Sequence, residues 1–337
     1  DKKIVITLSS GKEILTDMVV LSIGVKPENS LAKDASLKIG STGGIEVNDY
    51  MQTSDPDIYA LGDAIEFNNP IINKKFVIPL AGPANKQGRI VANNIAFGNK
   101  SKYSGTIATS IAKVFDLTVA STGLSEKLLK RESIPYIASI THSGSHAGYY
   151  PGALIMTTKL LFSPSDGKIL GAQIVGYDGV DKRIDVIATL LKCDKTIYDL
   201  ADVEHSYAPP YSSAKDPVNI AAFAAENILL KKTNIIHWYD IQKLDKDKSI
   251  LIDVRTPQEY QLGTIGDAKN IPVDVLRTKL NELPKNKKII IFCAVGLRGY
   301  LATRILLQNG FSDVYNLSGG YKTYEHTVHK QSNEDIY

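Results

Sequence analysis

The stretch KKIIIFCAVGLRGYLATRILLQNG, residues 287–310, contains the pattern that decides the fold of the carboxyl-terminal part of the chain. Residues 287–292 form a short apolar run rich in β-branched side chains, which predicts a buried strand. Residues 299–308 have the apolar spacing of an amphipathic helix, and Gly310 gives this helix an end. A buried strand followed directly by a helix is typical of a parallel sheet that is covered by helices.

The same alternation of strand and helix continues on both sides of this stretch. Strands are predicted at residues 249–255 and 314–317, and a helix is predicted at residues 273–283. Together these elements predict an α/β domain with a parallel sheet over residues 235–330.

Cys293 follows the predicted strand at its carboxyl end, the place where open α/β sheets bind ligands. Two interpretations are open, because a free cysteine is often a buried structural thiol and is also a candidate nucleophile. Gly296 allows a tight turn with inward-pointing backbone N–H groups, and Arg298 and the amino end of the next helix add positive charge. Such surroundings favour a thiolate that accepts a sulfur atom and holds it as a persulfide. Cys193 ends a helical pattern, where we expect a buried apolar thiol.

The composition is that of an ordinary soluble globular protein. The 337 residues are 43% hydrophobic and 22% charged with a net charge of +3, which gives no reason to expect nucleic acid as a partner. No apolar run is long enough for a membrane span, and the chain starts without a secretory signal. Only two cysteines are present, which argues against a disulfide scaffold and predicts a cytoplasmic protein.

The remaining sequence divides into two further blocks. Residues 1–104 alternate short strands with Gly, Asn and Asp turns, beginning with a predicted hairpin around Gly11. A helix is predicted at residues 89–97, where Gly98 ends it. Residues 105–232 combine strands with helices and predict an α+β domain. Its strands are expected at residues 153–162 and 168–177, joined by an Asp166-Gly167 turn, and its helices at residues 180–193 and 218–230.

Further motifs accompany Cys293 in the predicted α/β domain. LIDVRTPQEYQLGTIGDAKNIP, residues 251–272, and NLSGGY, residues 316–321, resemble two signature blocks of the rhodanese family. The resemblance covers about residues 236–330. It implies a sulfurtransferase-like domain in which Cys293 is the nucleophile.

The resemblance also assigns roles to the neighbours of this cysteine. It implies that Arg298 acts with the nucleophile and that Gly296 contacts the substrate. Thr264 stands where the family usually has His, and Gly299 stands where Ser or Thr is frequent. Both departures keep the sulfur acceptor and leave the preferred sulfur donor open. Two charged residues are expected to support the fold and the loop rather than perform chemistry: Asp253 and Arg255.

TSDPDIYALGDAIE, residues 53–66, ends an apolar strand in Gly-Asp, where a glycine lets the backbone approach a ligand and a carboxylate accepts hydrogen bonds. Such a turn is common when taken alone. In this context it resembles the second FAD-binding signature of the pyridine nucleotide-disulfide oxidoreductases. The resemblance implies that a helix starting near Gly82 points its positive amino end at the flavin. The residues implied for FAD binding are Thr53, Gly62, Asp63, Pro79, Leu80, Ala81 and Tyr207.

Residues 205–227, HSYAPPYSSAKDPVNIAAFAAEN, and residues 147–153, AGYYPGA, resemble the coenzyme A-disulfide reductases within that family. The resemblance implies that Tyr149 and Tyr207 reach the active site of the partner subunit, where they hydrogen-bond or protonate the departing thiolate. A tyrosine suits this role because it stays protonated at neutral pH. Interface packing is the alternative, since the chain has 17 tyrosines. The residues implied for coenzyme A binding are Asn85 and Lys215.

These resemblances imply a homodimeric FAD- and NAD(P)H-dependent reductase of CoA disulfide, CoA persulfide or polysulfide, with a rhodanese domain as sulfur carrier. The first FAD signature, the redox cysteine and the glycine-rich NAD(P)H loop of the family do not occur in the sequence. We therefore expect the carboxyl-terminal part of a longer reductase, without reductase activity of its own. The expected domains are 1–104 from the NAD(P)H/FAD region, 105–232 for dimerisation and 235–330 for the rhodanese unit. The alternatives are an NADH oxidase of the same family and a rhodanese module that binds sulfane sulfur without turnover.

Overall fold

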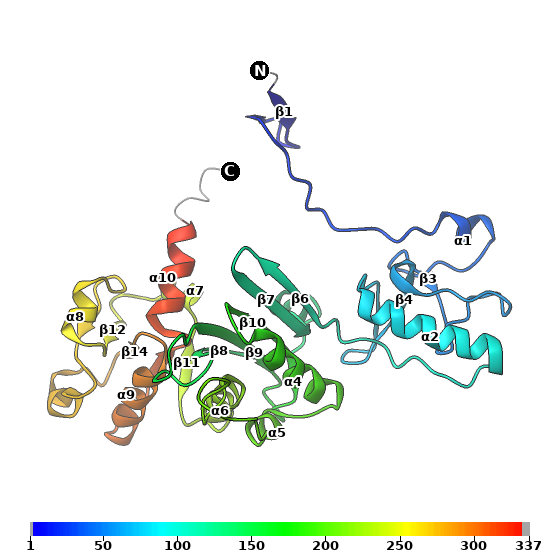
Figure 1. Cartoon of the computed structure of the whole chain (residues 1–337). Coiled ribbons are helices and arrows are strands. Elements are labelled where there is room, and N and C mark those ends of the chain that lie inside the picture. Colours follow the sequence, from blue (N-terminus) through cyan, green and yellow to red (C-terminus); the bar gives the residue numbers. More distant parts are fainter. Residues whose placement is uncertain (1–2, 332–337) are drawn as a thin grey trace. The chain divides into compact units, whose positions relative to one another are not determined.

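The computed structural model describes residues 3–331 of the chain (Figure 1). The chain forms two compact units, Asp1–Gly105 and Thr106–Tyr337, which are described separately. In the part of the chain that the structure describes, no helix is both long enough and apolar enough to cross a bilayer.

The first unit begins with the predicted hairpin. Strands β1 (Ile4–Thr7) and β2 (Glu13–Thr16) pair antiparallel, with Ile4 opposite Thr16. The turn between them contains Gly11 at φ +82°, a left-handed conformation that a glycine adopts at no steric cost. The hairpin prediction is therefore confirmed.

A small three-stranded sheet and one long helix form the rest of this unit. The sheet has the order β3-β4-β5, with β3 parallel to β4 and β5 antiparallel to it. Helix α2 ends at Gly98, as predicted. It begins at Ala81, before the range 89–97 that the apolar pattern predicts but next to the start near Gly82 that the resemblance implies. Pro83 is tolerated there because the first turn of a helix has no intrahelical partner for its N–H groups. The other elements are α1 (Ser30–Asp34), β3 (Ile45–Glu46), the 3₁₀ turn η1 (Gly62–Ala64), β4 (Ile65–Asn69), β5 (Lys74–Phe76) and α2 (Ala81–Phe97).

The second unit starts with a five-stranded antiparallel sheet in the order β6-β7-β10-β9-β8. Helix α4 packs against β7 and β10, and α6 packs against β8 and β9, which confirms the predicted α+β arrangement. The predicted Asp166-Gly167 turn joins β9 to β10, with Gly167 at φ +73°. The strands are β6 (Ser110–Val114), β7 (Leu117–Gly123), β8 (Ile137–Gly144), β9 (Ile155–Phe162) and β10 (Ile169–Gly176), and the helices are α3 (Glu126–Arg131), α4 (Val180–Lys192), α5 (Ile197–Ala201) and α6 (Pro217–Leu229).

The second sheet of this unit is parallel throughout, in the order β11-β15-β14-β12-β13, as the sequence predicts. Its central strand β14 is buried on both faces: Ile289 and Ile291 face one apolar cluster, and Ile290 and Phe292 face another. The strands are β11 (Asn234–Ile236), β12 (Ser249–Asp253), β13 (Lys269–Asn270), β14 (Lys288–Phe292) and β15 (Val314–Leu317), and the helices are α7 (Trp238–Ile241), α8 (Pro257–Gln261), α9 (Leu297–Gln308) and α10 (Gly320–Gln331).

One predicted helix has a different form. Residues 273–283 were expected to be an α-helix, but the chain there makes the 3₁₀ segment η2 (Leu276–Glu282). Leu283 is already extended at ψ 133° because it precedes Pro284, and a residue before proline is disfavoured in the helical region. The segment is consequently too short for a regular amphipathic helix.

Candidate functional site

The loop that follows β14 encloses the thiol of Cys293. The residue is 1% exposed, and its Sγ accepts a hydrogen bond of 3.1 Å from the backbone N–H of Gly296. Gly296 adopts φ +111° and is followed directly by helix α9, so the amino end of a 12-residue helix begins beside the loop. Backbone N–H groups and a helix amino end are the groups that stabilise a thiolate or a bound anion. The geometry thus places the predicted nucleophile in surroundings that suit negative charge.

Arg298, which the resemblance paired with the nucleophile, is held by a carboxylate. Its two terminal nitrogens each donate a hydrogen bond of 2.7 Å to Glu259, which lies at the start of α8. These bonds hold the pKa of Glu259 at about 2 and raise the pKa of Arg298, to which the nearby Cys293 also contributes. The pair therefore stays charged throughout the neutral range. Sequence reasoning missed Glu259, although its capping-box spacing from Thr256 was visible.

The structure explains Thr264, which stands where the rhodanese family usually has His. Thr264 donates a hydrogen bond of 3.0 Å to Asp253, which is also paired with Arg255 at 2.7 Å. Both charged residues are buried, and the guanidinium lies 4.1 Å from the ring centre of Tyr321. Thr264 therefore belongs to a buried polar network, in which it adds a further donor to a carboxylate oxygen that Arg255 also contacts.

The second departure, Gly299, is explained by Asn316 of the neighbouring strand β15. A Cβ atom at position 299 would lie 2.2 Å from Oδ1 of this asparagine, a distance that no side chain tolerates. The amide nitrogen of Asn316 donates 3.0 Å to the carbonyl oxygen of Gly296, and its Oδ1 has no hydrogen-bond partner among the described residues. Asn316 thus holds the carbonyl of Gly296, and it would have to move if position 299 carried a side chain.

The two predicted tyrosines lie together in the antiparallel part of the second unit. The hydroxyl oxygens of Tyr149 and Tyr207 are 2.8 Å apart, and the side chains are 76% and 48% exposed. The hydrogen bond between Tyr207 and Tyr149 raises the pKa of Tyr207, so this phenol keeps its proton at neutral pH. The pair can therefore donate a proton or a hydrogen bond to a ligand that approaches from outside the unit.

A buried ion pair fixes the two segments that carry these tyrosines. Arg183 is 1% exposed and donates to Asp216 at 2.9 Å and to the carbonyl oxygen of Ser145 at 2.7 Å. Ser212, which donates its hydroxyl to the same aspartate, accepts a hydrogen bond from the backbone N–H of Ala147 with its carbonyl oxygen. The anchoring pair was not predicted from the sequence, because its partners are 33 residues apart.

The predicted substrate residues Lys215 and Gly296 line one cavity of about 400 Å³ in the second unit. The cavity has an apolar wall from α6, including Phe223, and a polar wall from β8, including Ser139. Leu297 of the Cys293 loop belongs to the same lining. Lys215, which follows Tyr207 in the sequence, and the loop after Cys293 therefore line the same cavity.

The residues predicted for FAD lie in the first unit, around η1 and the start of α2. The backbone N–H of Gly62 donates 2.7 Å to the side chain of Gln87, which is 1% exposed, while Asp63 is exposed. No side chain caps the amino end of α2, and Ala81 at that end is exposed. A helix end with free N–H groups fits a flavin that carries negative charge.

Four other predicted binding residues of this unit differ in their contacts and exposure. The hydroxyl of Thr53 donates 3.1 Å to the carbonyl oxygen of Asp55, so it stabilises the turn before η1. Asn85 donates 3.0 Å to the carbonyl oxygen of Ala81 within α2 and is exposed. Pro79 is exposed and Leu80 is half-buried. Thr53 thus acts on the local backbone, and the other residues leave the helix end open.

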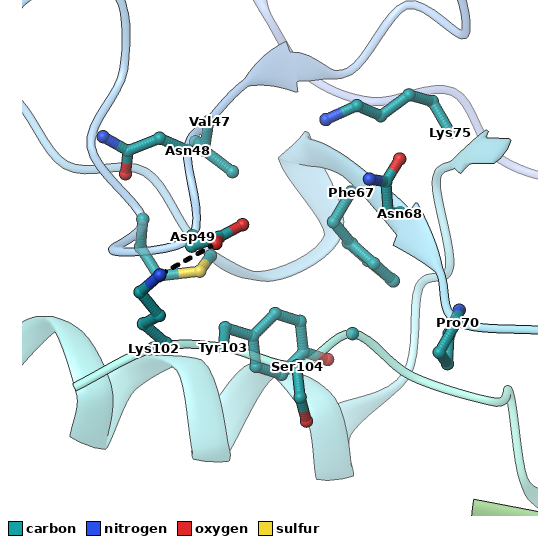
Figure 2. A pocket seen from close by; sticks show the side chains of 12 residues that line it. Val47, Asn48, Asp49, Phe67, Asn68, Pro70, Lys75, Lys102, Tyr103 and Ser104 are labelled. Atoms are coloured by element: carbon teal, nitrogen blue, oxygen red, sulfur yellow. Dashed lines mark ion pairs between the residues drawn. The ribbon is translucent and has the colours of Figure 1, made fainter. Parts of the chain in front are cut away.

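A separate cavity of about 340 Å³ in the first unit has other residues in its lining (Figure 2). Figure 2 shows the ion pair between Asp49 and Lys102, 3.5 Å long, beside the rings of Phe67 and Tyr103. The lining includes none of the residues predicted to bind FAD: it consists of Val47, Asn48, Asp49, Met51, Phe67, Asn68, Pro70, Lys75, Lys102, Tyr103, Ser104 and Gly105.

The expectation for Cys193 was wrong. This cysteine is a free, exposed thiol rather than a buried one. It lies at the carboxyl cap of α4, two residues after the buried Leu191, so its side chain falls outside the apolar face of the helix. Cys293 is also free and is buried.

Comparison with known families accounts for most of the chain. Residues 1–88 match the family described as pyridine nucleotide-disulphide oxidoreductase, and residues 109–217 match its dimerisation domain. Residues 240–327 match the rhodanese-like domain. The chain belongs to the pyridine nucleotide-disulphide oxidoreductases and carries a rhodanese-like domain.

Individual curated relatives match about two thirds of the chain. The coenzyme A disulfide reductase of Staphylococcus epidermidis is 34% identical over 66% of the chain, and the NADH oxidase of Methanocaldococcus jannaschii is 37% identical over 66%. These matches take in 50% and 49% of the relatives, so the chain spans about half the length of the curated proteins it matches.

Two solved structures resemble the chain along nearly its whole length. The reduced CoADR-RHD of Bacillus anthracis has a TM-score of 0.91 at 51% identity, covering 97% of this chain and 58% of that one. The NAD-dependent persulfide reductase of A. fulgidus has a TM-score of 0.86 at 39% identity, covering 96% of this chain and 58% of that one.

Proposed function

We propose that this chain is the carboxyl-terminal part of a FAD- and NAD(P)H-dependent reductase of CoA disulfide or CoA persulfide, with the rhodanese-like domain as its sulfur carrier. The observation that carries the proposal is that Lys215, beside the tyrosine segment, and Gly296, in the Cys293 loop, line one cavity. Similarity to the coenzyme A disulfide reductase and to the persulfide reductase supports the same substrates.

The sulfur-transfer step uses the thiolate of Cys293. It attacks the outer sulfur of a donor R–S–SH; a new S–S bond forms at Sγ, the S–S bond of the donor breaks, and R–S⁻ leaves. Cys293 then holds a persulfide, whose negative charge the N–H of Gly296 and the amino end of α9 stabilise. The reverse of this step passes the outer sulfur to the thiolate of CoA and gives CoA persulfide.

Reduction of CoA persulfide to CoA thiol and hydrogen sulfide consumes two electrons and two protons. FAD, when bound, relays the electrons from NAD(P)H; Gly62, Asp63 and the open amino end of α2 would hold it. Tyr207, kept protonated by its bond with Tyr149, donates a proton or a hydrogen bond to the departing CoA thiolate.

The dimerisation domain supports a homodimer in which the tyrosine pair of one subunit completes the site of the other. The high exposure of both rings fits a contact outside their own subunit. Lys215, also exposed, would meet an anionic group of CoA, and Asn85 would contact the same ligand. Both cysteines are free thiols, which supports a reducing compartment such as the cytoplasm.

Replacing each cysteine in the full-length protein tests the sulfur-carrier role. Cys293→Ser should abolish sulfur transfer from thiosulfate or CoA persulfide, because serine cannot form the persulfide, while reduction of CoA disulfide persists. Cys193→Ser is the matched control and should leave both activities intact. Equal loss of both activities in Cys293→Ser would mean that this thiol is structural.

An NADH oxidase is the second candidate, since one of the relatives carries that name. Oxygen consumption measured with and without CoA disulfide separates the two functions. We expect the full-length protein to reduce CoA disulfide in preference to oxygen. A rhodanese domain that only binds sulfane sulfur would show a persulfide on Cys293 without any transfer to an acceptor.

A further inference from the structure

Strand β8 of the dimerisation domain makes direct hydrogen bonds to the rhodanese-like domain. The backbone N–H of Ile140 donates 3.0 Å to the hydroxyl of Ser318, at the end of β15. Nε2 of His142 lies 3.1 Å from the carbonyl oxygen of Gly319 and 2.8 Å from the hydroxyl of Thr323. These contacts join residues about 180 positions apart, from segments that match two different families.

The contacts reach the turn Gly319-Gly320, whose two glycines face different neighbours. A Cβ on Gly319 would lie 2.2 Å from the hydroxyl of Thr323 and 2.8 Å from the side chain of Ile140. A Cβ on Gly320 would lie 2.5 Å from the carbonyl oxygen of Cys293. The turn is therefore held between the strand of the dimerisation domain and the backbone of the sulfur-acceptor loop.

The residues after this turn hold the loop directly. The backbone N–H groups of Tyr321 and Lys322, in the first turn of α10, donate 2.8 and 3.0 Å to the carbonyl oxygens of Cys293 and Ala294. These bonds fix the peptides at the start of the loop, whose Gly296 N–H donates to the thiol. A displacement of the turn would thus rotate the peptides between Cys293 and the amino end of α9. These peptides form the anion-binding cradle of the thiol.

His142 is suited to hold the turn in one position. Its Nδ1 lies 2.9 Å from the hydroxyl of Thr157, on the adjacent strand β9. Gly319 offers only a carbonyl oxygen, so the tautomer that satisfies every contact carries its proton on Nε2 and accepts from Thr157 at Nδ1. Burial, with smaller effects of Lys322 and His326, lowers the pKa of His142 to about 4. The ring is therefore neutral near pH 7.

We propose that His142 is a positioning residue for sulfur transfer: by donating to the carbonyl oxygen of Gly319, it fixes the Gly319-Gly320 turn and so the anion-binding loop of Cys293. The sulfur carrier is then completed by a side chain from the dimerisation domain. This inference rests on the proposed function, because it takes Cys293 as the sulfur acceptor.

The test compares variants of the full-length protein in two assays of Cys293. The first is sulfur transfer from thiosulfate to cyanide. The second is the ratio of alkylation rates with iodoacetate, an anion, and iodoacetamide, which is neutral, measured on the Cys293 peptide by mass spectrometry. A loose or partly unfolded domain accelerates both reagents, whereas a distorted cradle slows the anion selectively.

We expect His142→Ala to lower kcat/KM for thiosulfate roughly 10-fold or more, since small misplacements of reacting groups are costly. The iodoacetate-to-iodoacetamide ratio should fall by at least about threefold as the cradle loses anion affinity. His142→Gln, whose amide nitrogen can replace Nε2 as donor, should restore most of both values. His326→Ala, an exposed histidine on α10, is the matched control and should behave as wild type.

Unchanged kcat/KM and an unchanged alkylation ratio in His142→Ala would overturn the inference. If His142→Ala does not fold, Ser318→Ala removes the acceptor of the Ile140 hydrogen bond and must lower the same ratio. Reduction of CoA disulfide should stay within about twofold of wild type in all variants, since the cradle is not part of that step. Failure of the proposed function is distinguishable, because wild-type protein would then lack sulfur transfer altogether.

Discussion

The Cys293 loop and the tyrosine pair, both in the second unit, are built from different parts of the chain. Cys293 is 1% exposed, and its thiol accepts a hydrogen bond from the backbone N–H of Gly296, next to the amino end of α9. Tyr149 and Tyr207 are exposed side chains that form a hydrogen bond with each other. The buried ion pair of Arg183 and Asp216 fixes the segments that carry them. A site made of backbone depends on conformation, whereas a site made of side chains depends on individual functional groups. Substitutions should therefore affect the two sites in different ways.

The largest effect is expected from adding a methyl group at Gly320, next to the Cys293 loop. Gly320→Ala places a Cβ 2.5 Å from the carbonyl oxygen of Cys293, at a residue with φ +60°. Sulfur transfer should fall on the order of 100-fold through misplacement of the loop, and thermal unfolding should show a loss of about 1–3 kcal/mol from the strained backbone. Gly148→Ala, beside Tyr149, meets no atom within 4 Å and is the control. Equal behaviour of the two variants would refute the backbone account.

The second prediction removes one functional group from the tyrosine site. Tyr207→Phe in the full-length enzyme should lower turnover with CoA disulfide roughly 10- to 100-fold, because the lost proton or hydrogen bond belongs to the transition state. The apparent KM should change little, and sulfur transfer should be unaffected. Wild-type steady-state kinetics with both CoA disulfide and CoA persulfide would leave packing as the only role of this tyrosine.

A smaller effect concerns the glycine that replaces the common serine of the rhodanese loop. Gly299→Ser should displace Asn316 and weaken its bond to Gly296, at a cost of about 1–3 kcal/mol from overpacking. Adding Asn316→Ala should recover part of both stability and sulfur transfer, so the double-mutant cycle is not additive. Additive losses in denaturant unfolding would show that the two positions do not conflict.

The smallest effect near neutral pH is a dependence of stability on pH, because it develops only in acid. The pKa of His142 falls from its usual 6.5 to about 4 in the folded protein, so the unfolded chain binds its proton first as pH decreases. The stability that depends on the neutral ring is therefore complete above pH 6.5 and is lost between pH 6.5 and 4, by at most about 3 kcal/mol. His142→Gln should flatten the fall of the melting temperature in this range. His205 and His237, whose pKa values burial also lowers, contribute to the slope that remains, and Glu126 and Glu259 add to it near pH 4 because their pKa values are lowered to about 2.

The elements that the sequence predicted well are those with a local pattern. The hairpin around Gly11, the run of isoleucines in β14 and the helix that ends at Gly98 each depend on residues within one short window. The position of Cys293 after a parallel strand could be predicted for the same reason. The 3₁₀ form of residues 276–282 depends on a single proline that follows, and it was missed.

The supports of both sites could not be predicted, because each joins residues that are distant in the sequence. Arg183 pairs with Asp216, 33 residues away, and Arg298 pairs with Glu259, 39 residues away. His142 meets Gly319 across 177 positions and two domains. A motif identifies the reacting group, but only the folded chain shows which residues hold it.

The most direct test of the central claim is the mass of the Cys293 peptide after the full-length protein is treated with CoA persulfide or thiosulfate. The account predicts that this peptide gains one sulfur atom, that Cys193 gains none, and that added CoA thiol removes the sulfur as CoA persulfide. A Cys293 peptide of unchanged mass, in protein that still reduces CoA disulfide, would contradict the claim that this loop carries sulfur.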